Sequence, residues 1–559
     1  MKITPLLITV AALAAPLSAQ SRGGDTMIDS GVTQAYGTVV GAHDLNAVAV
    51  WNSDDTVFTS NSKDGGRNWS AAPIVIGGAT ASGAKRTYKD AIAFANGNVY
   101  VAYEDKASGS EEHMFSMSSD GGDTWSTPTM IPSAGSGYIT DIDVHANGQV
   151  LVVVSLALAF PNGCFVNVSY DNGATWTETR VDAALGDVDG IDASMSGNDL
   201  LVAFNDDSTG LNQTYAIVSN DSGNTFGPIV TLSSGGVGKT AYPVCYTENG
   251  DMVVAWIEDD SSVSGTYEDV IAAYSTDNGA TWGPAMNLTN TAALGFDCDN
   301  LEVYHSQQNA GTGGMTNFVF ENNTSGSDEV LCMSTDDYGV NFTTTNFGSG
   351  SYPRVAGKRS YVGIAYGSDP AGGYNENATL AVSRDGGFTF RASADVSQGT
   401  STGDADYTEI AIDSVYDNFI VGSLENRTGT NQMYVGGSRA ALIEAVVDPS
   451  IHSLQFNISG VGISASGPTS VQIVGAGASI PGAVSLPDGR DVLLNIDSIL
   501  IRTKSFAPFR VAIDAAGNGS TPVLSTPAGF YGATVLFGGV EFLGGGMFGT
   551  LIEPIAVTL

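Results

Sequence analysis

The chain has 559 residues and carries 59 acidic against 21 basic side chains, for a net charge of -38. So large a negative charge disfavours phosphate backbones and anionic membranes, and we expect no nucleic-acid partner. The cysteines have neither metal-ligand nor redox spacing and permit one or two disulfides whose pairing the sequence does not give: Cys164, Cys245, Cys298 and Cys332.

Residues 1–19 predict a secretory signal peptide. Met1 and Lys2 precede an apolar stretch that ends at Leu17, and Ala19 stands before the expected mature start at Gln20. No later segment offers about 18 apolar residues without charge, so we expect no transmembrane segment. The chain is predicted to be secreted, or exported to the cell surface or periplasm.

A short box with the pattern Ser-x-Asp-x-Gly-x-x-aromatic recurs along the chain. Its spacing is close to 50 residues, and one copy, from Ser334 to Phe342, requires an inserted residue, Tyr338, to fit. Repeats of this length with strand patterns inside them are typical of β-propellers. The box aspartates are Asp64, Asp120, Asp171, Asp221, Asp277, Asp336 and Asp385.

Each repeat predicts three strands before its box and one after it. In the second repeat, 90–94 and 99–103 are β-rich runs joined by Asn96-Gly97, which is a strong hairpin signal. Counting strand sets gives eight units, because 408–436 repeats the order without a box. A spare segment, 26–34, is expected to complete the last blade and close the ring. We therefore predict an all-β propeller of about eight four-stranded blades, with seven as the alternative, over residues 26–445.

Residues 446–559 lack the repeat. Short apolar runs such as 471–474 and 492–496 are broken by Gly, Pro, Ser and Asp clusters. This pattern predicts a small C-terminal all-β domain of sandwich type. It contains no chemical motif, and attachment, sorting and plain stabilisation are all compatible with it.

The chemistry of the box indicates a locked turn between the third and fourth strands of a blade. Its Ser and Asp oxygens can accept from local N–H groups, its Gly supplies a positive φ, and its aromatic side chain packs over the turn. The pattern resembles the Asp box, or BNR repeat, of the sialidase superfamily. Both the resemblance and the outer position of these hairpins imply that the box aspartates are structural.

The opposite loops are the candidate site. Loops that enter the innermost strand and leave the second strand of each blade emerge on one face around the axis, which we call the crown. They combine acids with aromatic residues, a composition suited to sugar binding and to hard cations such as calcium, although Asp and Asn also simply initiate turns. No cofactor is required. The ligand-binding candidates are Tyr88, Asp90, Asp141, Asp189, Tyr242, Asp299, Glu321 and Asp406.

The family resemblance also implies a possible catalytic set. Catalytic sialidases generally use a six-bladed propeller, three arginines that clamp the substrate carboxylate, a tyrosine nucleophile with a glutamate base, and an aspartate acid. This chain departs from that pattern, since it lacks the early Phe-Arg-Ile-Pro motif and has no arginine between Arg180 and Arg354. The catalytic candidates are Arg86, Arg354, Arg427, Tyr352, Tyr407, Glu104, Glu258 and Glu425.

Two functions follow from the sequence. The first is an exported propeller that binds extracellular glycan or a protein partner through the crown. The alternative is an exo-acting glycoside hydrolase of sialidase type. The arginine clamp discriminates between them, because only the hydrolase needs it.

Overall fold

The computed structural model describes residues 22–438 apart from short gaps, the longer of which are 78–84, 87–90, 107–111, 133–137, 234–239, 260–267, 290–296, 307–313, 370–375, 398–404 and 414–417. Beyond residue 440 it describes the backbone of strands only. The chain divides into two compact units, residues 24–439 and residues 1–23 with 440–559. Within the described ranges no helix is long and apolar enough to cross a membrane. The predicted signal peptide lies outside the described residues.

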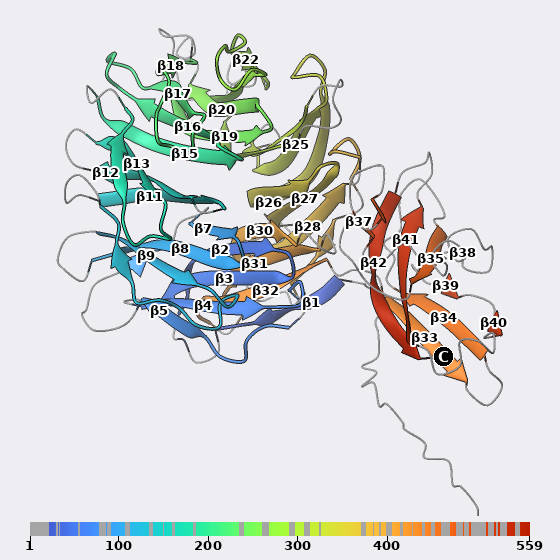
Figure 1. Cartoon of the computed structure of the whole chain (residues 1–559). Helices are drawn as coiled ribbons and strands as arrows, with labels where there is room; N and C mark the ends of the chain where they lie inside the picture. Colours follow the sequence, from blue (N-terminus) through green and yellow to red (C-terminus); the bar gives the residue numbers. More distant parts are fainter. Residues whose placement is uncertain are drawn as a thin grey trace, which may run out of the picture. The chain divides into compact units, whose positions relative to one another are not determined.

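The first unit is a propeller of antiparallel strands (Figure 1). Its first blades contain β2 (Tyr36–His43), β3 (Asn46–Ser53), β4 (Thr56–Ser62) and β5 (Ile74–Gly77); β6 (Lys85–Arg86), β7 (Ile92–Ala95), β8 (Asn98–Asp105), β9 (Glu112–Ser118) and β10 (Thr129–Met130); β11 (Tyr138–Asn147), β12 (Val150–Leu158), β13 (Gly163–Ser169) and β14 (Thr177–Arg180); and β15 (Val188–Ser196), β16 (Asp199–Asp206), β17 (Gln213–Ser219) and β18 (Val230–Thr231).

The later blades continue the same order. They contain β19 (Thr240–Glu248), β20 (Asp251–Asp259), β21 (Glu268–Ser275) and β22 (Met286–Asn287); β23 (Cys298–Ser306), β24 (Met315–Asn322), β25 (Glu329–Thr335) and β26 (Thr343–Lys358); β27 (Tyr361–Ser368), β28 (Asn377–Ser383) and β29 (Ala394–Asp395); and β30 (Ala405–Ile412), β31 (Phe419–Glu425), β32 (Gln432–Ser438) and β1 (Arg22–Met27).

The blade count depends on β26. This strand pairs with β25 through its first half and with β27 through its second half, so it ends one four-stranded unit and begins the next within a single seven-stranded sheet. The propeller strands thus form seven sheets that contain eight units, each of four strands except the second, in which β6 and β7 both pair with β8. Both counts that the sequence left open are contained in this arrangement, and the all-β propeller prediction is confirmed.

The two ends of the propeller close in one blade. The sheet order is β1, β32, β31, β30, so the N-terminal strand supplies the outer strand of the last unit. The amide of Ile28 donates to the carbonyl of Met433 at 2.9 Å, and the Asp29 carboxylate accepts from the amide of Met433 at 2.7 Å. The predicted closure is confirmed, although the strand begins at Arg22 rather than at residue 26.

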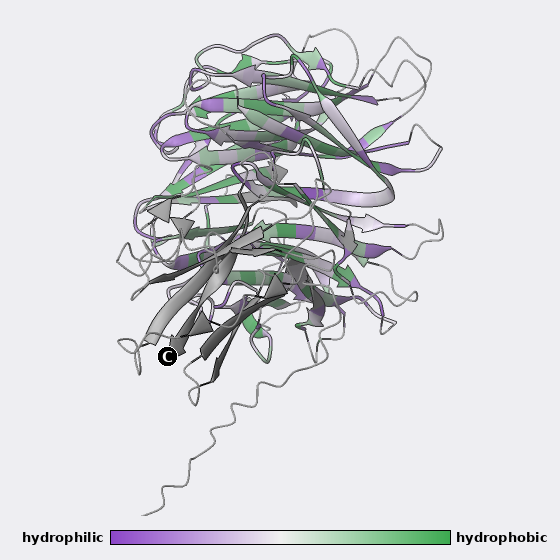
Figure 2. Ribbon diagram, turned by 90° about the vertical axis from the view of Figure 1, so that its right-hand side faces the viewer, coloured by the Kyte–Doolittle hydropathy of each residue, from purple (hydrophilic) through white to green (hydrophobic). Residues whose placement is uncertain are grey.

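Neighbouring blades pack through alternating side chains. In β16, Leu200, Val202 and Phe204 join a cluster with β12 and β13, whereas Leu201 and Ala203 join a cluster with β20. Because successive residues of a strand point to opposite faces, a strand between two blades must be apolar on both. Figure 2 accordingly shows hydrophobic stretches within the propeller strands and hydrophilic residues at many of the turns.

The second unit is also built of strands. In its first sheet β33 (Leu442–Asp448) pairs with β34 (Ser453–Ser459), and β34 also pairs with β39 (Gly519–Ser520) and β40 (Leu524–Ser525). The second sheet has the order β38 (Arg510–Ala512), β35 (Ser470–Ala476), β41 (Thr534–Phe542) and β42 (Phe548–Thr558). A separate two-stranded sheet pairs β36 (Val484–Ser485) with β37 (Asp491–Val492). The predicted boundary after residue 445 falls inside β33, which pairs with β34 and belongs to this unit.

Candidate functional site

The innermost strands bulge where they begin. The register shifts near the crown end of seven of them, namely β2, β11, β15, β19, β23, β26 and β30. A bulge adds one unpaired residue and redirects its side chain, and such features cluster near functional sites. The bulges therefore form a repeated structure around the axis, in seven of the eight blades.

Three of the bulges place a tyrosine in a left-handed conformation. The φ values of Tyr242, Tyr352 and Tyr407 are 50°, 49° and 51°. Tyr242 and Tyr407 are 67% and 49% exposed. The rings of Tyr352 and Tyr407 lie 4.9 Å apart with a tilt of 33°, so these two residues form one aromatic surface across neighbouring blades.

Glu321 fixes the backbone beneath this surface. Its Oε1 accepts from the amide of Tyr352 and, at 2.7 Å, from Nδ2 of Asn300, the residue with φ 50° in the bulge of β23. Burial raises the pKa of Glu321, and the nearby charges of Asp328 and Asp299 add to the rise against these hydrogen bonds. The predicted ligand carboxylate is therefore buried and positions two bulges.

The two described arginine side chains of the catalytic set are held by carboxylates. Arg354 lies between Glu302 of β23, at 3.2 Å, and Glu409 of β30, at 3.1 Å, and so joins three neighbouring blades. Neither glutamate was singled out from the sequence. An arginine already paired with two carboxylates is poorly available to clamp a substrate carboxylate.

Arg427 has a different set of partners. It pairs with Asp25 and Glu425, and its guanidinium lies 4.5 Å from the centre of the Tyr434 ring. Glu425 is buried and also accepts from Ser423 at 2.8 Å; burial and the charge of Asp25 raise its pKa, while Arg427 opposes the rise. These contacts tie the closing strand β1 to its blade, so Arg427 and Glu425 have a structural role.

Three other crown acids have hydrogen-bond partners within the protein. Asp206 accepts from the amide of Ser208 at 2.7 Å, which is ordinary turn chemistry. Asp189 accepts from Nδ2 of Asn212, 23 residues away, at 2.8 Å. Glu258 accepts from Nε1 of Trp256, on the same strand, at 3.0 Å. The turn-forming explanation therefore accounts for Asp206, while the other two acids hold side chains of their own blade.

For the remaining predicted site residues the structure describes fewer contacts. Glu104 is buried, with Nζ of Lys106 at 3.5 Å from its Oε1, and its backbone pairs with that of Arg86. The pKa of Asp299 is raised by partial burial and by the charges of Asp297 and Asp328. Tyr88 and Asp90 lie outside the described residues, and only the backbone is described for Arg86, Asp141 and Asp406.

The Asp boxes form the expected locked turns. In the second box, Oγ of Ser118 donates to Asp120 and accepts from the amide of Gly122, both at 2.8 Å, and Gly122 has a φ of 95°. Asp120 also accepts from the amide and the hydroxyl of Thr124 at 2.9 and 2.6 Å. These bonds lower the pKa of Asp120 to about 2. In every box a Thr or Asn precedes the aromatic residue and can hydrogen-bond to the box Asp in this way. The sequence pattern did not assign this residue a role.

The sixth box requires a correction. Oγ1 of Thr335 donates to Asp337 at 2.8 Å, and Asp337 accepts from the amide of Asn341 at 2.9 Å. The box is therefore Thr335-x-Asp337-x-Gly339-x-x-Phe342, with regular spacing and no inserted residue. Asp336 was assigned wrongly, because the alignment started from Ser334, whose hydroxyl donates instead to Asn317 and to the carbonyl of Gly387.

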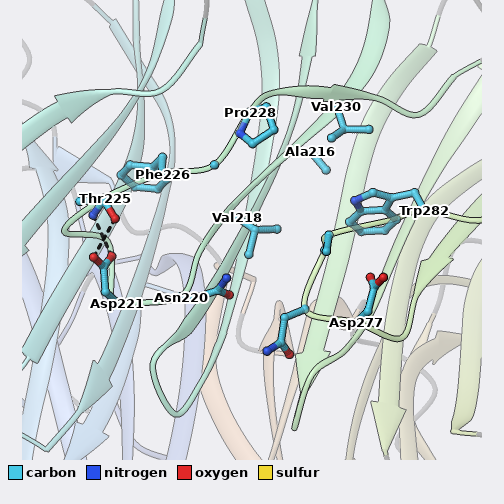
Figure 3. Close-up of a pocket in the computed structure, with 14 residues that line it drawn as sticks. Ala216, Val218, Asn220, Asp221, Thr225, Phe226, Pro228, Val230, Asp277 and Trp282 are labelled. Atoms are coloured by element: carbon cyan, nitrogen blue, oxygen red, sulfur yellow. Dashed lines mark hydrogen bonds between the residues drawn. The ribbon is translucent and has the colours of Figure 1, made fainter.

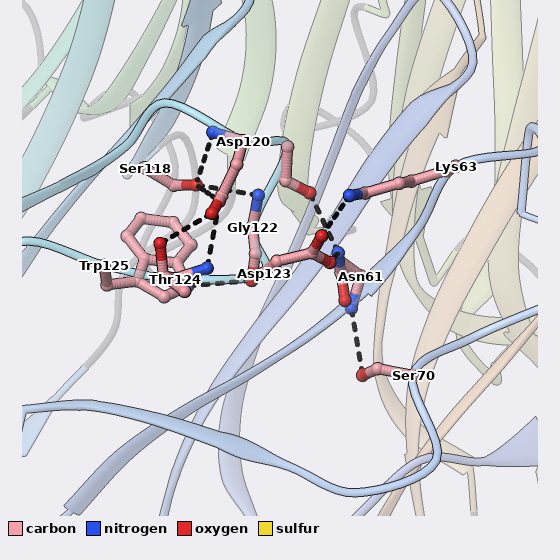
Figure 4. A network of polar contacts seen from close by, with 10 residues as sticks. Asn61, Lys63, Ser70, Ser118, Asp120, Gly122, Asp123, Thr124 and Trp125 are labelled. Atoms are coloured by element: carbon pink, nitrogen blue, oxygen red, sulfur yellow. Dashed lines mark hydrogen bonds and ion pairs between the residues drawn. The ribbon is translucent and has the colours of Figure 1, made fainter.

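The boxes also contact the preceding blade. Figure 4 shows Nδ2 of Asn61, on β4, donating to Asp123 of the second box at 2.7 Å, beside the ion pair between Lys63 and Asp123. A Cβ on Gly173 would lie 2.3 Å from Phe115, so this box glycine is also needed for close packing. The boxes thus lock both their own hairpin and the joint between blades.

Neither a metal centre nor a disulfide occurs in the part of the chain that the structure describes. It contains no group of three or more His, Cys, Asp or Glu residues that could hold a metal ion. The four cysteines are buried and form no disulfide with one another; Cys164 and Cys245 lie in two separate blades, and Cys298 and Cys332 lie on β23 and β25 of a third. The calcium expectation stays a prediction, and the expected disulfides do not form among these thiols.

Residues 44–254 match the family model described as the BNR repeat-like domain. These residues therefore carry a BNR-repeat-like domain, and they lie within the β-propeller. No curated protein matches the sequence significantly. Among solved structures, this BNR-repeat propeller is similar to a polysaccharide lyase described as an ulvan lyase, with 12% identity over 62% of this chain and 92% of that chain, at a TM-score of 0.42.

Two sialidases are also similar to the BNR-repeat propeller. A Hadza microbial sialidase is 15% identical over 60% of this chain and 73% of its own, with a TM-score of 0.33. Trypanosoma rangeli sialidase in complex with sialic acid is 12% identical over 78% and 89%, with a TM-score of 0.34. Likenesses at this level do not indicate which activity this chain has.

Proposed function

We propose that the protein binds a glycan at the crown, with Tyr242, Tyr352 and Tyr407 as the stacking surface. The observation that carries this proposal is the strained backbone of these residues. A left-handed conformation costs a bulky residue about 1–3 kcal/mol, and it persists only where the surroundings impose it. At the same bulge position β2 has Gly37 and β23 has Asn300, residue types that adopt this conformation at low cost. The bulge therefore does not require tyrosine.

The tyrosine rings suit a sugar because their faces are apolar and their hydroxyls are polar. Tyr242 and Tyr407 are exposed, and the Tyr407 ring lies 4.9 Å from that of the partly buried Tyr352. The net charge of -38 and the pairing of Arg354 and Arg427 with carboxylates disfavour an anionic sugar. The ligand class that fits best is a neutral extracellular glycan chain.

The test is a titration of the purified full chain. A glycan array first identifies a neutral glycan that binds, and calorimetry then compares wild type with Tyr352→Ala and Tyr407→Ala. Each substitution is expected to weaken binding at least tenfold, or about 1.4 kcal/mol. Tyr170→Ala is the matched control, because Tyr170 is 52% exposed on an outer hairpin. Unchanged affinity in both crown variants, or binding only to a protein partner, would contradict the proposal.

A sialidase-like hydrolase is the second candidate. One observation favours it: Glu321, whose pKa is raised, is hydrogen-bonded to the backbone of Tyr352 within the aromatic surface. A raised carboxyl pKa is what a general acid needs near neutral pH. Turnover of a fluorogenic sialoside that Arg354→Ala abolishes would establish the hydrolase, and absence of turnover alongside glycan binding would exclude it.

A further inference from the structure

A groove on the outer side of the propeller separates two successive Asp boxes. It has a volume of about 540 Å³ and lies between the hairpin of β17 and β18 and the box that follows β21. Its floor includes Ala216 and Val218 of β17. It is independent of the crown, because the crown lies on the innermost strands and the groove on the outermost hairpins.

The groove is open because two positions are small. Val218 and Asn278 line it, immediately before the box Ser and the box Gly respectively. At the next joint between blades the equivalent residues are Tyr274 and Tyr338, whose rings pack edge to face with centroids 5.7 Å apart. The propeller therefore fills this space with aromatic rings at one joint and leaves it empty at the preceding one.

Aromatic and polar side chains line the groove. Figure 3 shows Phe226 on one side and Trp282 on the other, with Val218 between them and the Asn220 amide at the rim. Nε1 of Trp282 is buried without a hydrogen-bond partner, as is Nε1 of its box equivalent Trp176, whereas Nε1 of Trp125 donates to the carbonyl of Gly122 at 3.2 Å.

The charge of the groove selects among ligands. Asp221 and Asp277 stand at its rim, and hydrogen bonds from Thr225 and Thr281 lower their pKa values, so both are ionised at neutral pH. No lysine or arginine lines it. Fixed negative charge without a cation repels uronic and sialic acids. The volume is in the range of small-ligand sites, and the Trp282 ring in the lining is the kind of aromatic surface on which a sugar ring stacks.

From these observations we infer that the groove is a second saccharide site, specific for a short segment of a neutral glycan. A ligand there would contact two blades at once, at a place remote from the crown. The site does not depend on the function proposed for the crown. The two are distinguishable because no residue is shared between them.

The test uses calorimetry on the full chain with neutral hexasaccharides of cellulose, xylan and mannan and with hexagalacturonate. Asn278→Tyr reproduces the residue that fills the next joint, and Tyr338 there has a φ of 56°, close to the 57° of Asn278, so the fold should accept it. We expect Asn278→Tyr to weaken neutral-glycan binding at least tenfold and Asn278→Ala to leave it within twofold. Trp282→Ala should also weaken it tenfold, in contrast to its box equivalent Trp176→Ala.

Other outcomes overturn the inference. Binding that Asn278→Tyr and Trp282→Ala leave unchanged would place the ligand elsewhere, and loss in Tyr352→Ala alone would assign it to the crown. Preference for hexagalacturonate, binding of a peptide instead of a sugar, or no binding by any neutral hexasaccharide at millimolar concentration would also reject it. Because Asn278→Tyr adds a side chain instead of removing one, the test remains decisive if Trp282→Ala fails to fold.

Discussion

Replacing Asp337 by alanine is expected to destabilise the propeller, whereas replacing its neighbour Asp336 is not. Asp337 accepts from Oγ1 of Thr335 at 2.8 Å, from the amide of Asn341 at 2.9 Å and from Nδ2 of Asn341 at 2.7 Å. A net hydrogen bond contributes about 0.5–1.5 kcal/mol, and solvent at this exposed hairpin reduces the sum. We therefore expect a loss of about 1–2 kcal/mol for Asp337→Ala.

Urea unfolding followed by tryptophan fluorescence measures the difference, and hydrogen exchange of the peptide 335–342 locates it. Asp336→Ala is the matched control, one residue away, and should stay within about 0.5 kcal/mol of wild type. The amide of Asn341 should lose protection only in Asp337→Ala. If Asp336→Ala costs as much as Asp337→Ala or more, the corrected box alignment is wrong.

Three further predictions concern charge. Arg354→Gln leaves Glu302 and Glu409 without their cation, so it should lower the free energy of unfolding in urea by about 1–3 kcal/mol at pH 7 and by less at pH 4. An equal loss at both pH values would contradict this role of Arg354. The pKa of Asp120 falls from 3.8 to about 2 on folding, so the Asp120 carboxylate stabilises the fold fully above pH 3.8 and loses this effect toward pH 2. The difference in free energy of unfolding between wild type and Asp120→Asn should therefore become smaller, not larger, as the pH falls toward 2. The pKa of His113 falls from 6.5 to about 3, so stability should drop as the pH falls below 6.5, and His113→Leu should show a smaller drop than wild type.

The sequence was sufficient for the blades because their signals are local. A hairpin dipeptide such as Asn96-Gly97 and a box such as Ser118 to Trp125 each fix their own turn, and repetition fixes the ring. The sixth box was misassigned because Thr335 serves as well as Ser at the first position, and adjacent Ser334 and Asp336 formed a competing match. The regular spacing from Thr335 to Phe342 was the available signal, and the hydrogen bonds to Asp337 decide between the two alignments.

The site was predicted less well because it depends on register. Tyr242 and Tyr352 were named, but the bulges that turn them left-handed arise from pairing between strands. The repeated Tyr-Pro dipeptides 242–243 and 352–353 were the available signal. The partners of Arg354, Glu302 and Glu409, lie 52 and 55 residues away on other blades, a distance over which sequence spacing carries no contact information.

The central claim is that the left-handed tyrosines of the crown bind a glycan. Its most direct test is a calorimetric titration of wild type and of the double variant Tyr352→Gly, Tyr407→Gly with the best neutral glycan found on the array. Glycine accepts the observed φ without strain, so this variant keeps the bulges and removes only the rings. We expect a stable fold with binding weakened more than tenfold. Undiminished binding by a folded double variant would contradict it.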